Sequence, residues 1–286
     1  MTLETLVGRA VGPAGFVVGD EAVGEFVAAT GDDPIRWRHH APPGFAAAAL
    51  FAVAPAFLDD PKVARHSRSL LHTEQAFTWE RPLAVGEALG VQGRVTAVRS
   101  RGPLDLVLFA VAASGPGGRW MEGVSSFLLS AEAADEAAEE LEPPPDERAA
   151  CDSAVPLPLP APGEALAPLR RGASRADLGR YAAATGDWNP IHREHDAARA
   201  AGLPGVVAHG LLIANWLFQA AARYRPGPDP LRSARVRFRR PLRPAVAAVI
   251  TGKVAARGEA GAEVELALES AASGAPLATA AVRVTP

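Results

Sequence analysis

The chain reads Tyr181-Ala-Ala-Ala-Thr-Gly-Asp-Trp-Asn-Pro-Ile-His192 at the point where a predicted helix ends and a tight turn begins. Asp187 and His192 are the only carboxylate and imidazole groups of this stretch. Asn189 tolerates unusual backbone angles, and Pro190 fixes its own φ angle and keeps the preceding residue extended. The stretch therefore predicts a rigid turn that holds an acid and a base close together.

A second signal follows shortly downstream, in Gly202-Leu-Pro-Gly-Val-Val-Ala-His-Gly210. It runs directly into an apolar segment that predicts a helix over about 207–224, and a helix that is apolar nearly all round must be surrounded by protein. Backbone N–H groups at a helix start have no partner within the helix, and the helix dipole favours negative charge there. The Gly210 amide is therefore a candidate donor to an oxyanion, and glycine would let a substrate carbonyl approach closely.

The same pattern occurs earlier in the chain, where Phe26-Val-Ala-Ala-Thr-Gly-Asp-Asp-Pro-Ile35 parallels the stretch from Tyr181 to Ile191. Three further pairs follow in the same order and at similar spacing: Pro43-Gly44 with Pro204-Gly205, Arg81-Pro82-Leu83 with Arg240-Pro241-Leu242, and Gly93-Arg94-Val95 with Gly252-Lys253-Val254. Four collinear pairs predict a duplicated domain, because the period is too long for a solenoid.

Each half predicts the same series of elements. A short helix comes first, over about 20–30 with Asp20 as its cap, and over about 174–184 with Ser174 as its cap and Asp177 at the third helical position. A longer helix follows each turn, over about 45–58 in the first half. Strands are then expected at 71–77, 88–98, 104–114 and 120–130, and at 234–239, 246–255, 263–270 and 277–284. A helix wrapped by an antiparallel sheet, repeated twice, predicts an α+β double hot-dog whose halves pair as an intrachain pseudo-dimer.

The predicted domains are residues 1–130 and 164–286, joined by a linker over 131–163. The linker is acidic in its first part and proline-rich in its second, a composition that cannot build a core. It predicts a solvated, semi-extended tether between the halves. A segment that docks a partner is the alternative.

The overall composition excludes several classes of function. The net charge of -3 provides no field that would attract nucleic acid or a membrane. Cys151 is the only cysteine, so an intrachain disulfide is impossible, as is usual in the cytoplasm. The first residues show no basic region followed by an apolar run, so we expect no signal peptide and a cytoplasmic protein. The most apolar run, 206–222, is short for a bilayer span and carries three polar side chains.

The motif Tyr-x-x-x-Thr-Gly-Asp-x-Asn-Pro-Ile-His at 181–192, together with Ala-His-Gly-Leu-Leu at 208–212, resembles the MaoC-like (R)-specific enoyl-thioester hydratase and dehydratase family. The first half is similar to the degenerate N-terminal domain of double hot-dog members, through Leu71-His-Thr-Glu-Gln-Ala-Phe-Thr-Trp-Glu-Arg-Pro-Leu-Ala-Val-Gly86. The resemblance implies a double hot-dog fold. It also implies reversible hydration of trans-2-enoyl thioesters of coenzyme A or an acyl carrier protein to (R)-3-hydroxyacyl thioesters. Neither a metal nor a cofactor is implied beyond the coenzyme A or phosphopantetheine of the substrate.

By the same resemblance, Asp187 and His192 are the catalytic pair and share one water. The sequence leaves open which of the two is the base. Gly210 is expected to support the reaction as the oxyanion donor, and Asn189 to shape the turn and to hydrogen-bond the pair.

The first half departs from the motif, since it keeps Asp32 but has Arg36 where histidine is expected. We therefore expect one active site, in the second half. The helical region of the first half, about 45–57, would help to shape an acyl pocket.

Several arginine and histidine residues allow both a functional and a structural interpretation. Arg235, Arg237 and Arg239 alternate with apolar residues, which is typical of a strand with one basic face. With Arg240 and Arg243 adjacent, that face would bind the phosphates of coenzyme A or phosphopantetheine, or it is simply solvated. His209 would contact substrate, or it packs against or caps the helix. His192 and His195 suggest a metal, but no third ligand is evident, so we predict none.

Two other functions share these features. A hot-dog acyl thioesterase would activate water against the thioester carbonyl, and a non-catalytic subunit would only bind acyl thioesters. Whether two chains form a homodimer is left open.

Overall fold

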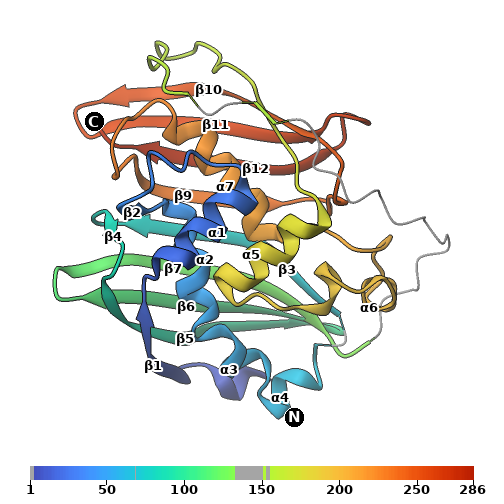
Figure 1. Ribbon diagram of the computed structural model, residues 1–286. Helices are drawn as coiled ribbons and strands as arrows, with labels where there is room; N and C mark the ends of the chain where they lie inside the picture. Colours follow the sequence, from blue (N-terminus) through green and yellow to red (C-terminus); the bar gives the residue numbers. More distant parts are fainter. Residues whose placement is uncertain (1–2, 68, 133–150, 153–154) are drawn as a thin grey trace.

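The computed structural model describes residues 3–67, 69–132, 151–152 and 155–286, and its main feature is one ten-stranded antiparallel sheet. Helices gather on one face of this sheet, and the first and second halves of the chain occupy opposite ends of it (Figure 1). In spatial order the strands are β1 (Ala10–Val17), β5 (Ala88–Arg101), β6 (Leu104–Gly115), β7 (Gly118–Ser130), β3 (Ser69–Trp79), β9 (Leu231–Phe238), β12 (Pro276–Val284), β11 (Gly261–Ser270), β10 (Ala248–Gly258) and β8 (Leu169–Arg171). A small separate sheet pairs β2 (His40–Ala41) with β4 (Leu83–Ala84).

The sheet confirms the duplication and the double hot-dog fold. Counted outward from the central β3–β9 pair, the strands of each half follow in the same order along the chain. At the centre Ala76 pairs with Arg235, and these two residues have the same spacing as Arg81 and Arg240. A pseudo-twofold axis therefore passes through the Ala76–Arg235 pair. All eight predicted strands are present, whereas β1, which contains Gly12-Pro13, and the very short β8 were not predicted.

The helices differ in length between the halves. The longer ones are α1 (Asp20–Thr30), α5 (Arg175–Thr185) and α7 (Gly210–Ala222), and the shorter ones are α2 (Ala46–Phe51), α3 (Ala54–Leu58), α4 (Pro61–Ala64) and α6 (His195–Ala200). Single 3₁₀ turns are η1 (Leu3–Leu6), η2 (Pro43–Phe45) and η3 (Pro190–His192). Within the described residues, none of these helices is long and apolar enough to cross a lipid bilayer.

Two helix predictions are wrong. The helix predicted over 45–58 is interrupted between α2 and α3, because Pro55 lacks an N–H group and its ring clashes with the carbonyl one turn earlier. Asp20 is the first helical residue rather than the cap, since Gly19 is the N-cap and makes no side-chain hydrogen bond. The Ser174 cap is confirmed: its hydroxyl accepts from the Asp177 amide at 3.1 Å, and the Asp177 carboxylate accepts from the Ser174 amide at 2.8 Å.

One pair of the sequence repeat is not equivalent in position. Pro43 and Gly44 lie within η2, at the start of the helical region of the first half. Pro204 and Gly205 instead precede α7 by several residues. The other three pairs carry the duplication.

The predicted linker is described only in part, because residues 133–150 and 153–154 lie outside the described residues. At its end Leu157 and Leu159 pack against the core, and the Leu157 amide donates to the carbonyl of Arg223 at 2.9 Å. This end is therefore docked on the second half rather than fully solvated.

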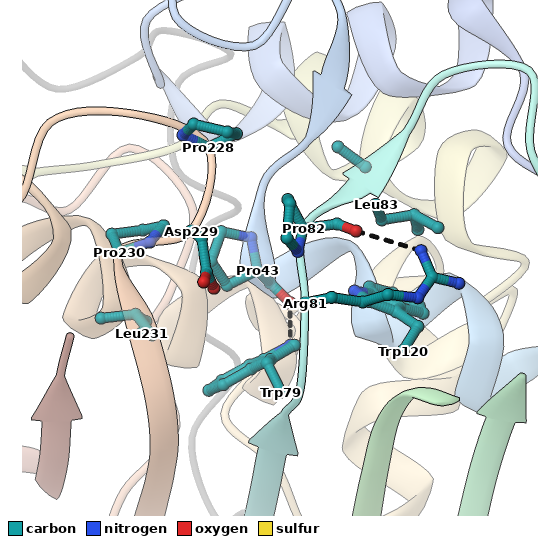
Figure 2. A pocket seen from close by; sticks show the side chains of 11 residues that line it. Pro43, Trp79, Arg81, Pro82, Leu83, Trp120, Pro228, Asp229, Pro230 and Leu231 are labelled. Carbon is teal, nitrogen blue, oxygen red and sulfur yellow. Dashed lines mark hydrogen bonds between the residues drawn. The ribbon is translucent and has the colours of Figure 1, made fainter. Parts of the chain in front are cut away.

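The two halves interlock around α7, whose residues from Leu211 to Ala222 are all buried. Phe26 of α1 packs on Tyr181 of α5 with ring centroids 5.4 Å apart, so the two short helices also meet. The start of η2 is held by Trp79, whose indole N–H donates to the Pro43 carbonyl at 3.1 Å (Figure 2). The fold thus presses the beginning of the first-half helical region against α7.

Candidate active site

The turn that carries the predicted acid follows directly from the end of α5. Gly186 has a φ of 79°, a left-handed conformation that glycine adopts without strain and that ends the helix. The Asp187 carboxylate then accepts a hydrogen bond from the Asn189 amide at 3.4 Å, and the Asn189 side chain accepts one from the Ile191 amide at 3.3 Å. Asn189 thus shapes the turn and hydrogen-bonds both residues of the pair, since its backbone carbonyl accepts from the His192 amide at 3.1 Å.

His192 is held in one tautomer by the chain that leads to α7. Its Nδ1 lies 2.8 Å from the Val207 carbonyl, so Nδ1–H donates and Nε2 keeps its lone pair. The ring also stacks on His209, with centroids 3.9 Å apart. The imidazole is therefore oriented so that its basic nitrogen, Nε2, takes no part in the hydrogen bond to Val207.

His209 contacts the predicted catalytic pair from the protein interior rather than from the cavity. Its side chain is fully buried and does not line the cavity described below. Its Nε2 lies 3.2 Å from the backbone carbonyl of Asp187, and since a carbonyl only accepts, Nε2–H donates. His209 also contacts the Tyr181 ring at 4.9 Å. This placement fits packing and positioning of the pair better than contact with a substrate.

Burial dominates the electrostatics of the pair. It raises the pKa of Asp187 to about 7, and the hydrogen bond from the Asn189 backbone opposes this shift only in part. Burial likewise lowers the pKa of His192 to about 4, against the opposing effect of its bond to Val207. Between about pH 4 and 7 the site therefore favours a neutral carboxylic acid beside a neutral imidazole, a pattern typical of acid–base sites.

A cavity of about 900 Å³ opens beside the pair and is lined by both halves of the chain. Asp187, Asn189, His192 and Gly210 all lie in its wall. The first half contributes Phe51, Pro55 and Leu58 from the interrupted helical region, and Leu70, Leu71, His72, Thr73 and Phe127 from β3 and β7. The sequence predicted a contribution from the helical region, but the contribution of β3 was missed.

Gly210 is the predicted oxyanion donor. It is the first residue of α7, in the cavity wall, and the Ile213 amide closes the first turn onto His209. A Cβ atom added at Gly210 would meet only the Phe238 ring, at an ordinary contact distance of 3.5 Å. Packing by the protein therefore does not demand glycine at this position.

The three predicted arginines lie in two different environments. Arg239 lines the cavity together with the adjacent Arg240. Arg235 and Arg237 point away from the buried face, on which Val236 lies, and both form ion pairs with Glu74 at 3.5 and 2.9 Å. Their placement supports the solvated-face interpretation for these two.

The corresponding turn of the first half makes different contacts. Asp32 is half-buried, and burial raises its pKa against the lowering effects of the Asp33 backbone, Trp37 and Arg36. The Arg36 guanidinium donates to the carbonyls of Ala222 at 3.0 Å and Arg225 at 2.6 Å, at the end of α7. The residue that replaces the motif histidine thus caps a helix, which leaves the acid–base pair of the second half as the candidate site.

Asp187, His192 and His209 each offer one ligand atom within 4.8 Å of the others, a spacing that could also hold a cation. One nitrogen of each histidine is already engaged by a backbone carbonyl. The same closeness lets one water touch both the acid and the base. Absence of a metal stays a prediction.

A second hollow, of about 10 Å³, lies at Arg81-Pro82-Leu83 and shares no lining residue with the large cavity (Figure 2). It is too small for a ligand and lies in the junction between the halves.

Each half of the chain matches a known family model. Residues 159–267 match the family model described as MaoC like domain, and residues 5–114 match the FAS1-like dehydratase domain region. The chain is 36% identical over 216 residues to 3-hydroxyacyl-thioester dehydratase X of Mycobacterium tuberculosis, covering 74% of this chain and 68% of that protein.

Solved structures extend the likeness to the whole chain. The crystal structure of HtdX of Mycobacterium tuberculosis has a TM-score of 0.67 and 27% identity, over 96% of this chain and all of that one. A MaoC-like dehydratase has a TM-score of 0.76 and 22% identity over 99% of both chains. The fold and these relatives define a double hot-dog enzyme of the hydro-lyase class. The chain belongs to the MaoC-like dehydratase family.

Proposed function

We propose that this protein reversibly hydrates trans-2-enoyl thioesters to (R)-3-hydroxyacyl thioesters, with Asp187 and His192 as the catalytic pair. The observation that carries the proposal is that the Asp187 carboxyl, the His192 imidazole and Gly210 lie in the wall of one cavity. The matching relative named as a 3-hydroxyacyl-thioester dehydratase supports the substrate class, and the family resemblance supports the (R) configuration.

In the hydration direction His192 is the base. Its Nε2 lone pair accepts a proton from water while the water oxygen bonds to C3, and the electrons of the double bond move toward the thioester oxygen. The Gly210 N–H and the positive end of the α7 dipole stabilise this developing charge. The protonated Asp187 carboxyl then gives its proton to C2, and His192 returns its extra proton to Asp187. Dehydration is the same sequence in reverse.

The rim of the cavity suits the carrier part of the thioester. Arg239 and Arg240 lie there with exposed guanidinium groups that can pair with the phosphates of coenzyme A or phosphopantetheine. The thiol carrier is then part of the substrate, and the acid–base chemistry calls for no metal or further cofactor.

The direct test mixes the purified protein with short and medium trans-2-enoyl-CoA. We expect loss of the conjugated-enoyl absorbance without release of free thiol. Thiol release would instead identify a thioesterase. Binding without turnover at every chain length, and with carrier-protein thioesters, would identify an acyl-binding subunit.

The pH dependence follows from the two perturbed groups. Asp187 must keep its proton, so kcat/KM is expected to fall as the pH rises through about 7; His192 must stay neutral, so kcat/KM is expected to fall as the pH drops through about 4. The measurement is kcat/KM for one enoyl-CoA from pH 4 to 9. A profile that keeps rising above pH 8 would contradict these protonation states.

A further inference from the structure

His72 is a polar side chain in the cavity wall with no role in the proton transfers above. Its ring lies between those of Phe127 and Phe238, with centroids 4.9 and 5.1 Å away. Its Nε2 is buried and has no hydrogen-bond partner among the described residues. Burial lowers the pKa of His72 to about 4, partly offset by contacts with the Glu74 backbone and the Gln75 side chain, so the imidazole is neutral. A neutral ring nitrogen left unpaired in an aromatic setting needs an explanation.

The backbone turns His72 toward the cavity. In a regular strand His72 would share a face with Glu74, which points outward and pairs with Arg237. The register of β3 against β7 shifts between these two residues, however: Glu74 pairs with Ser126, but His72 pairs with Phe127. Thr73 is therefore the extra residue of a β-bulge, and bulges of this kind re-aim side chains beside active sites.

The pseudo-twofold partner of His72 is a leucine. The spacing that relates Arg81 to Arg240 places His72 on Leu231, and β9 shows the same register shift, with Ser233 opposite Arg283 but Leu231 opposite Val284. Leu231 is an ordinary core residue, 1% exposed. The bulge is thus present in both halves of the fold, whereas the imidazole is present only at the copy of this position that lines the large cavity.

His72 also lies close to the proposed oxyanion donor. Phe238 touches the His72 ring on one side, and on the other it comes within 3.5 Å of the position of a Cβ atom on Gly210. One aromatic ring therefore separates His72 from the place where the thioester oxygen would sit. A chemical group that reached His72 would therefore lie close to the thioester and would be part of the same substrate molecule.

We propose that His72 is a specificity-determining residue whose Nε2 hydrogen-bonds a polar group of the bound thioester. This inference rests on the proposed function. Two parts of such a substrate supply the chemistry: the first amide of the pantetheine arm, or an oxygen substituent on the acyl chain. Either would pair the buried nitrogen when substrate binds.

The test compares the wild type with His72→Leu, which copies the residue of the second half, and with His72→Gln, which keeps hydrogen-bonding capacity. Circular dichroism and thermal melting check that both variants are folded. The substrates form two matched pairs: the crotonyl thioesters of N-acetylcysteamine, which has the amide, and of propanethiol, which lacks it; and 6-hydroxy-trans-2-hexenoyl-CoA with trans-2-hexenoyl-CoA.

If the amide is the partner, His72→Leu is expected to lower kcat/KM about tenfold for the N-acetylcysteamine thioester and both CoA thioesters, but not for the propanethiol thioester. If an acyl oxygen is the partner, only the 6-hydroxy substrate is affected. His72→Gln is expected to recover part of the loss. Equal effects on all four substrates, or none, would overturn the proposal while the wild type remains active. A wild type inactive on every thioester would instead remove the proposed function.

Discussion

Asp187→Asn is expected to lower kcat/KM for enoyl-CoA hydration about 10²–10⁴-fold, because the amide has the shape of the acid but cannot exchange a proton. The loss is chemical rather than structural, since the folded site holds this carboxyl with its pKa raised to about 7. A pKa raised above that of the unfolded chain means that ionised Asp187 destabilises the folded protein at pH 8. We therefore expect Asp187→Asn to melt at or above the wild-type temperature at that pH.

The matched control is Asp32→Asn, which changes the corresponding carboxyl of the first half. Asp32 lies beside Arg36, which caps the end of α7 instead of completing an acid–base pair. This variant is expected to keep its hydratase activity, measured by enoyl absorbance. An active Asp187→Asn variant, or an inactive but folded Asp32→Asn variant, would place the chemistry elsewhere.

The turn at 186–192 and the start of α7 were predictable because each depends on a continuous stretch of sequence. The glycine in the left-handed conformation, the proline after Asn189 and the apolar helix after Gly210 each act over a few residues. The strands were predictable because alternation of apolar side chains marks the buried face directly. Both kinds of signal survive without knowledge of the tertiary structure.

The parts that were not predictable depend on contacts between distant segments. Alternation showed that Arg235 and Arg237 share a face, but only the assembled sheet shows that Glu74 on β3 pairs with them and that the cavity lies on the other side. The positioning role of His209 rests on contacts of its ring with His192 and with the Asp187 carbonyl, both of which are distant in sequence. The inward turn of His72 depends on a bulge, which a period of two residues cannot reveal. The helix break at Pro55, in contrast, follows from a local signal, because proline cannot continue a helix.

Gly44→Ala is expected to destabilise the protein by about 1–3 kcal/mol, as overpacking of a buried contact does. A Cβ atom at Gly44 would lie 1.9 Å from Oδ1 and 2.9 Å from Cβ of Asn215, which is buried on α7. The contact cannot be relieved by the end of the asparagine side chain alone, because its Cβ is also too close. Trp79 holds the neighbouring Pro43 carbonyl, so η2 cannot simply withdraw.

Gly24→Ala is the matched control, since Gly24 lies on the exposed side of α1 and an added Cβ would meet nothing within 4 Å. There alanine is expected to stabilise the helix by up to about 1 kcal/mol, so the same substitution has opposite signs at the two positions. Urea unfolding of both variants measures the difference. Because α7 begins at Gly210, displacement of this helix by Gly44→Ala should also lower kcat/KM, while Gly24→Ala should leave it unchanged. Equal stability of the two variants would show that α7 and η2 are not pressed together as described.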